Sequence, residues 1–132
     1  MPKVSVIIPV YGVEKYIERC ARSLFEQSLV DMEFVFVNDC TKDNSIDILL
    51  KVINEYPQRK NQIKILNHEV NKGLPAARQT GIKVAEGDYI AHCDSDDWVT
   101  PNAYQEMYET AVKENADMTI CDFFVSNGKV HR

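Results

Sequence analysis

Three carboxylates fall within four residues at Asp94-Ser95-Asp96-Asp97, directly after the apolar run Tyr89-Ile90-Ala91-His92-Cys93. Like charges this close raise one another's pKa unless a cation lies among them. If the extended geometry of the run persists, Asp94 and Asp96 project to the same side, because side chains alternate along a strand. Carboxylate oxygens are ligands that Mg²⁺ and Mn²⁺ prefer, especially where phosphates complete the coordination shell. The pattern predicts a metal-dependent nucleotide site.

The elements that must position these carboxylates alternate between strand and helix along the chain. Residues 4–8 are nearly all apolar and β-branched, which is typical of a strand covered on both faces. Further strands are predicted at 34–37, 63–66, 89–93 and 118–125. Apolar residues at three- and four-residue spacing predict helices at 13–24, 43–56, 75–85 and 100–111. This order predicts an α/β fold, with a doubly wound, mainly parallel sheet and helices on both faces.

Proline and capping residues set two of the predicted boundaries. Pro9 should end the first strand, and Thr100 should cap the last helix with Pro101 at its first position. In that helix Tyr104 and Tyr108 lie at helical spacing and should face the core.

Polar residues follow three of the predicted strands at the point where each strand ends. Tyr11 follows the first strand, Asp39 the second, and Asp94 and Asp96 the fourth. In a parallel sheet the carboxyl ends of the strands share one edge, and ligands bind beyond that edge. We therefore expect these side chains to form one site.

Composition excludes several other classes of protein. The chain has 132 residues, enough for one domain, and its net charge of -5 argues against a nucleic-acid partner. No apolar run approaches the roughly 20 residues of a membrane span. The four cysteines show no metal-type spacing, which indicates reduced thiols in a cytoplasmic protein. His92 and Cys93 should point to opposite faces of their strand, and His68 and His131 are expected at the surface.

Four motifs in this order resemble those of the family 2 glycosyltransferases. They are Ser5-Val6-Ile7-Ile8-Pro9-Val10-Tyr11, Val37-Asn38-Asp39-Cys40-Thr41-Lys42-Asp43, Asn71-Lys72-Gly73-Leu74-Pro75-Ala76-Ala77-Arg78 and Asp94-Ser95-Asp96-Asp97. The resemblance implies a GT-A fold, similar to the Rossmann fold, in an enzyme that transfers a sugar with inversion. The donor would be a nucleotide-diphosphate sugar, most commonly a UDP-sugar.

The resemblance also implies a role for each nucleotide-binding residue. Pro9 and Tyr11 would border the base, usually uracil, and Asp39 would accept a hydrogen bond from the ring nitrogen of the base. Arg78 would flank the nucleotide together with the backbone near Gly73.

The acidic motif would hold the sugar diphosphate through a metal ion, Mg²⁺ or Mn²⁺. Asp94 would approach the ribose or the base, Asp96 would bind the metal, and Asp97 would share that work. Two positions depart from the family pattern: Gly12 stands where Asn is usual, and Asn38 replaces an acidic residue before Asp39. Neither departure touches the metal ligands.

The catalytic base is not assigned. Inverting transfer needs a carboxylate that takes a proton from the acceptor, and in the family this group comes from a later segment. We expect residues 1–132 to be the nucleotide-sugar-binding part of the domain, without the acceptor-binding part. The catalytic base would then lie beyond Arg132; within the chain, Asp122 is a candidate for it. The isolated chain is expected to bind a nucleotide without turnover. The acceptor would be a glycan or lipid-linked molecule of polysaccharide or cell-envelope synthesis, and the full-length protein would be cytoplasmic, at the inner face of the membrane.

Three other classes of protein share part of this pattern. A response-regulator module would carry its acidic pair after the first strand, where this chain has Pro9-Val10-Tyr11. A nucleotidyltransferase would need a basic, glycine-rich loop there, and Gly12 is a single glycine without suitable cations. A non-catalytic module that binds a nucleotide sugar stays open.

Overall fold

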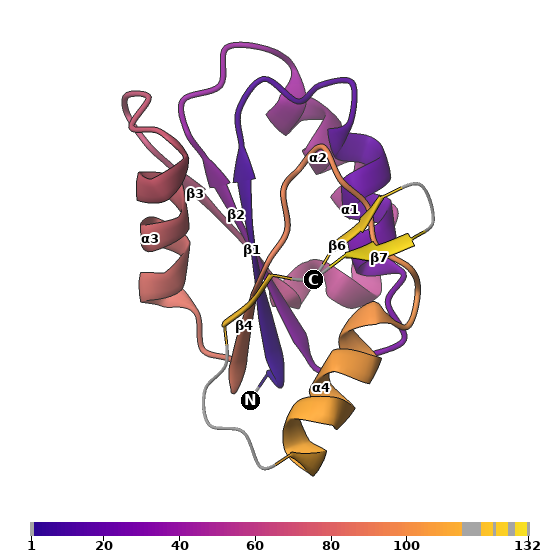
Figure 1. Ribbon diagram of the computed structural model, residues 1–132. Helices are drawn as coiled ribbons and strands as arrows, with labels where there is room; N and C mark the ends of the chain where they lie inside the picture. Colours follow the sequence, from indigo (N-terminus) through magenta and orange to yellow (C-terminus); the bar gives the residue numbers. More distant parts are fainter. Residues whose placement is uncertain (1, 115–119, 123, 127–128, 132) are drawn as a thin grey trace.

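The computed structural model describes residues 2–114, 120–122, 124–126 and 129–131 (Figure 1). The elements are β1 (Val4–Val10), α1 (Ile17–Phe25), β2 (Met32–Asn38), α2 (Ser45–Asn54), a 3-10 helix (Pro57–Gln62), β3 (Ile63–Asn67), α3 (Leu74–Val84), β4 (Tyr89–His92), α4 (Ala103–Lys113), β5 (Ile120–Asp122), β6 (Phe124–Ser126) and β7 (Lys129–His131). Within the described residues, no helix is both long and apolar enough to cross a membrane.

The central sheet has five strands in the order β3-β2-β1-β4-β5, and every neighbouring pair is parallel. This confirms the predicted doubly wound α/β fold. The predicted last strand is replaced by the short β5 and by β6, which forms a separate antiparallel hairpin with β7. Met118, at the start of that prediction, lies outside the described residues.

Helices cover both faces of the sheet, with α3 on one side and α1, α2 and α4 on the other (Figure 1). Along β1, Val6 and Ile8 face the larger core, while Ile7 faces α3. Both faces are therefore apolar, which explains the nearly continuous apolar run of this strand. Gly81 lets α3 approach closely, because a Cβ atom there would meet Ile7 Cγ2 at 2.5 Å.

The prediction that Pro9 ends β1 is wrong, because the strand continues to Val10. The carbonyl oxygens of Ile7 and Pro9 both point toward the β4 side, where they accept from Cys93 N and Ser95 Oγ. The nitrogen of Pro9 faces the same side, beyond the last paired residues of β4. A missing N–H therefore costs no ladder hydrogen bond at this position.

The predicted start of α4 is also wrong. Thr100 and Pro101 form a turn, Asn102 is the N-cap residue, and the helix begins at Ala103. The α1–β2 connection holds this turn, since Gln27 Nε2 donates to Thr100 O at 2.6 Å and Gln27 Oε1 accepts from Tyr104 N at 3.1 Å. The inner face of α4 is as predicted: Tyr104 is buried, and Tyr108 packs against the core.

The order of the strands reverses direction between β1 and β4. The chain adds β2 and then β3 on one side of β1, and returns through α3 to place β4 on the other side. In doubly wound sheets a crevice opens at this switch point, beyond the carboxyl ends of the strands. The predicted site residues follow these same strands.

Candidate functional site

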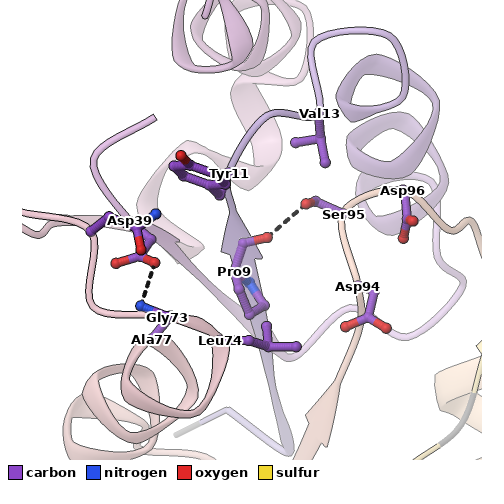
Figure 2. A pocket seen from close by; sticks show the side chains of 11 residues that line it. Pro9, Tyr11, Val13, Asp39, Gly73, Leu74, Ala77, Asp94, Ser95 and Asp96 are labelled. Carbon is purple, nitrogen blue, oxygen red and sulfur yellow. Dashed lines mark hydrogen bonds between the residues drawn. The ribbon is translucent and has the colours of Figure 1, made fainter. Parts of the chain in front are cut away.

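A pocket of about 430 Å³ lies at the carboxyl ends of β1, β2 and β4 (Figure 2). Its lining comes from loops far apart in the sequence: Pro9, Tyr11, Val13, Asp39, Asn71, Gly73, Leu74, Ala77, Asp94, Ser95 and Asp96. Pro9, Tyr11, Asp39, Asp94 and Asp96, all predicted from the sequence, are therefore brought together. The prediction that they share one edge of the sheet is confirmed.

Asp39 occupies one end of the pocket and is 3% exposed. Its Oδ1 accepts from Lys72 N at 2.8 Å, and its Oδ2 accepts from Gly73 N at 2.9 Å, at the start of α3. Burial opposes ionisation of this carboxyl, but hydrogen bonds from His68, Lys72 and Gly73 outweigh it and hold its pKa below the usual range. Asp39 is therefore an ionised acceptor in a buried place.

His68 was expected at the surface, and this prediction is wrong, because its side chain is only 6% exposed. Its Nδ1 lies 2.8 Å from Asp39 Oδ1, and its Nε2 lies 2.8 Å from Thr80 Oγ1 on α3. The residue follows β3, whose carboxyl end lies at the same edge as the pocket. Its place after a parallel strand is the one sign in the sequence that His68 could lie near the site.

The loop that carries Tyr11 is held by a group of side chains from the β2–α2 connection, Thr41, Asp43 and Ser45. The backbone N–H groups of residues 12, 13 and 14 donate to Thr41 Oγ1, Ser45 Oγ and Asp43 Oδ2 at 2.8, 3.1 and 3.2 Å. Burial raises the pKa of Asp43, but hydrogen bonds led by those from Ser45 and Thr41 lower it to about 2. These three side chains, here called the loop clasp, fix the loop that carries Tyr11. Tyr11 itself is 54% exposed.

The two departures from the family pattern now have structural explanations. Gly12 adopts φ +64°, in the left-handed region that Asn also tolerates, and its N–H bonds to Thr41. Asn38 accepts from Thr41 N at 2.9 Å and donates to Asn67 at 3.0 Å, so it braces the loop and is not among the pocket-lining residues.

The acidic motif forms the opposite end of the pocket (Figure 2). Asp94 and Asp96 are exposed on either side of the buried Ser95. The strand geometry assumed for them does not persist, because β4 ends at His92 and Asp97 N donates to Asp94 O at 3.0 Å in a turn. One carboxylate oxygen from each of Asp94, Asp96 and Asp97 lies within 4.8 Å of the others. Three hard oxygen donors gathered this closely fit a divalent cation, and Asp97 joins the cluster although it is not among the lining residues.

Ser95 joins the acidic motif to β1. Its hydroxyl donates to Pro9 O at 2.6 Å, and the residue is 4% exposed. The bond turns Ser95 inward and leaves its two neighbours facing the pocket. This role of Ser95 was not predicted, since nothing in the sequence identifies Pro9 O as its partner.

Arg78 approaches the acidic motif from α3. Its Nη2 lies 3.2 Å from Asp94 Oδ1, so it partly offsets the crowded negative charge. It was predicted to flank the nucleotide, and in the structure it contacts the pocket through Asp94. An exposed pair of this kind contributes little to stability.

Among the cysteines whose side chains are described, none takes part in the acidic cluster. Cys20, Cys40 and Cys93 are free thiols, as predicted for the part of the chain whose side chains are described. Cys93 faces the larger core, where its Sγ lies 4.0 Å from Cys20 Sγ. This contact and burial raise the pKa of the Cys20 thiol well above its ordinary value. A zinc pair of His92 with Cys93 is therefore not favoured, as the sequence indicated.

Comparison with known proteins places this geometry in a family. The family model described as "Glycosyl transferase family 2" matches residues 5–132. The glycosyltransferase EpsJ of Bacillus subtilis (strain 168), described as uncharacterized, is 41% identical over 124 residues, which are 94% of this chain and 35% of EpsJ. A poly(ribitol-phosphate) beta-glucosyltransferase of Bacillus spizizenii is 35% identical over 96% of this chain and 20% of its own length. The chain thus spans about a third or less of these relatives.

Solved structures agree with the fold. A crystal structure of residues 1–349 of S. aureus TarS in complex with UDP has a TM-score of 0.76 at 31% identity, covering 86% of this chain and 33% of that one. The mannosyltransferase PcManGT from Pyrobaculum calidifontis, in complex with GDP-Man and Mn²⁺, has a TM-score of 0.74 at 24% identity, covering 88% and 33%. The predicted GT-A fold is confirmed by these matches. With a match that runs from residue 5 to residue 132, this chain belongs to glycosyl transferase family 2.

Proposed function

We propose that residues 1–132 form the nucleotide-sugar-binding part of a metal-dependent glycosyltransferase. The protein would transfer a sugar with inversion from a nucleotide-diphosphate donor, a UDP-sugar, to a glycan or lipid-linked acceptor of cell-envelope or polysaccharide synthesis. One observation carries this proposal: a single pocket joins a buried hydrogen-bond acceptor, Asp39, to an exposed carboxylate cluster, Asp94, Asp96 and Asp97.

The two ends of the pocket suit the two ends of a nucleotide diphosphate. Tyr11 offers an exposed aromatic ring beside Asp39, which is a suitable place for a planar base. The carboxylates at the other end repel a bare diphosphate, so they would need a divalent cation between themselves and the ligand. Asp96 and Asp94 would hold the cation, with Asp97 in support.

The donor class is supported by relatives. TarS has been crystallised with UDP and with UDP-GlcNAc, and this chain is 31% identical to it over 86% of its length. A polymeric acceptor is supported by the related poly(ribitol-phosphate) beta-glucosyltransferase, whose name gives a polymer as its acceptor.

The chemistry divides between the metal and the residues of the chain. A bound divalent cation would neutralise the diphosphate and stabilise it as the leaving group. Asp39, Pro9 and Tyr11 would orient the nucleoside, and Asp94 would lie near the ribose. No described residue is assigned as the catalytic base; Asp122 lies on β5, opposite His92 in register.

Calorimetric titration tests the proposal. UDP, GDP and dTDP would be titrated into the chain with Mn²⁺, with Mg²⁺ and with a chelator. We expect metal-dependent binding that is tightest for UDP and at least about tenfold weaker in Asp96→Asn. Asp88→Asn is the matched control, since it removes an exposed carboxylate just before β4, at the opposite end of the strand. Equal UDP affinity with and without metal would refute the metal-dependent site.

Turnover separates the transferase from a binding module. The whole protein is expected to release UDP from a UDP-sugar when an acceptor glycan is supplied, and the isolated chain is expected to bind without turnover. Metal-dependent binding in a whole protein that never transfers sugar would favour the non-catalytic alternative.

A further inference from the structure

We propose that His68 is a positioning residue for base recognition. It holds the Asp39 carboxylate so that one acceptor position stays open to the pocket, and that position selects a nucleobase with a ring N–H. The inference rests on the proposed nucleotide site and adds the residue that sets its selectivity. His68 is not among the pocket-lining residues, so it acts through Asp39.

The acceptor positions of Asp39 are nearly all occupied. An ionised carboxylate accepts about four hydrogen bonds, two on each oxygen. Oδ1 accepts from His68 Nδ1 and from Lys72 N, while Oδ2 accepts from Gly73 N. One position on Oδ2 remains, on a residue that lines the pocket. Figure 2 shows the carboxylate between the Tyr11 ring and Gly73.

The contact between His68 and Asp39 is compatible with both protonation states of the imidazole. A carboxylate only accepts, so His68 Nδ1 carries the hydrogen in either state. The Thr80 hydroxyl adapts at the other nitrogen. It donates to Ala76 O at 3.0 Å when Nε2 carries a hydrogen, and it can turn to donate to Nε2 when Nε2 does not. Thr80 therefore fixes the ring from α3 in both cases.

This fixed acceptor distinguishes nucleobases by chemistry. The pyrimidine ring of uracil carries an N–H that can donate to Oδ2, whereas cytosine presents a bare ring nitrogen at the same place. A bare nitrogen facing a carboxylate makes no hydrogen bond and leaves two acceptors in contact. The pocket should therefore prefer UDP to CDP, and the preference should depend on His68.

Paired amide variants of His68 test this dependence. In His68→Asn the amide nitrogen can replace Nδ1 and keep the bond to Asp39; in His68→Gln it can replace Nε2 and keep only the contact with Thr80. Dissociation constants would be measured for UDP, CDP and pyrophosphate with Mn²⁺. Pyrophosphate reports on the acidic end of the pocket alone, since it carries no base.

We expect wild type and His68→Asn to prefer UDP to CDP by about tenfold, and His68→Gln to lose most of that preference. Pyrophosphate affinity should stay within about twofold in all three proteins. Thr80→Val should reduce the preference in part, while Thr110→Val, an exposed threonine of α4, should leave it unchanged.

Three results would overturn the inference. They are a preference that survives in His68→Gln, a preference lost equally in both amide variants, and a loss of pyrophosphate binding in His68→Gln that matches its loss of UDP binding. The last would show a merely structural role. Absence of metal-dependent UDP binding in the wild type would instead refute the proposed function, and this inference with it.

Discussion

The two ends of the pocket are built in opposite ways. At the Asp39 end, hydrogen bonds from His68, Lys72 and Gly73 satisfy a buried carboxylate. At the acidic end, Asp94 and Asp96 are exposed, and Arg78 contributes a single contact at 3.2 Å. The first end is stabilised by donors from the protein and leaves one acceptor position on Asp39 Oδ2, whereas the second concentrates charge that a cation would relieve. The two ends of the pocket thus differ in how far their charged side chains are satisfied by the protein itself.

Removal of the Asp39 carboxylate should give the largest effect. Asp39→Ala leaves three donors without their acceptor, and we expect the free energy of unfolding to fall by about 3 kcal/mol. Asp96→Ala, the matched change at the acidic end, should alter stability by less than about 0.5 kcal/mol. Urea unfolding of both variants measures the contrast. Comparable losses in the two variants would show that the ends do not differ.

Substitution of Gly73, at the Asp39 end of the pocket, should have the second largest effect on stability. Gly73 adopts φ +94° and ψ +167°, a region that other residues rarely enter, so Gly73→Ala should cost about 2 kcal/mol. Gly12→Asn is the control, because φ +64° suits Asn and a Cβ atom there meets nothing within 4 Å. Thermal unfolding should show little change for Gly12→Asn. A large loss of stability in Gly12→Asn would mean that the φ angle does not explain the cost of Gly73→Ala.

Ser95 links the two ends, and its removal should have a smaller effect on stability. Ser95→Ala leaves the buried Pro9 carbonyl without its hydroxyl partner, at a cost of about 1 kcal/mol. Because Asp94 and Asp96 then lose their anchor, metal-dependent UDP binding should weaken more than stability predicts. The two losses can be compared by unfolding and titration on the same samples. Unchanged UDP affinity would show that the acidic motif holds its shape without this bond.

Substitution of Asp43 in the loop clasp should have the smallest effect, which appears as a pH dependence of stability. The folded pKa of Asp43 is about 2, below the ordinary 3.8, so its ionised form stabilises the fold. That contribution is fully present above about pH 4 and is lost as the pH falls toward 2. The difference in unfolding midpoint between wild type and Asp43→Asn should therefore narrow between pH 5 and pH 2.5. A constant difference would indicate that ionisation of Asp43 does not matter.

The sequence predicted the fold and most of the pocket for one physical reason. Alternating strand and helix patterns imply parallel strands, and parallel strands bring Tyr11, Asp39 and Asp94 to a shared edge. Residues that lie next to strand ends in the chain were therefore placed correctly. The same rule applied to His68 after β3, yet a lone histidine gives no sign of its partners.

The errors involve contacts between distant segments. Pro9 continues β1 because β4 ends early on that side, and the start of α4 depends on Gln27, 77 positions before Tyr104. Ser95 looks like a spacer between acidic residues until Pro9 O is known to be its partner. Local propensity contains none of this information, since each outcome depends on where another part of the chain lies.

Backbone pairing between β1 and β4 covers Val4 to Ile7, and β1 then extends three residues farther. Beyond Ile7 the two strands are no longer paired, and the Ser95 hydroxyl connects them where backbone hydrogen bonds would otherwise do so. A single hydroxyl tolerates small changes of spacing that a rigid ladder resists. The spacing between the Asp39 end and the acidic end of the pocket therefore depends at this point on one side-chain hydrogen bond from Ser95.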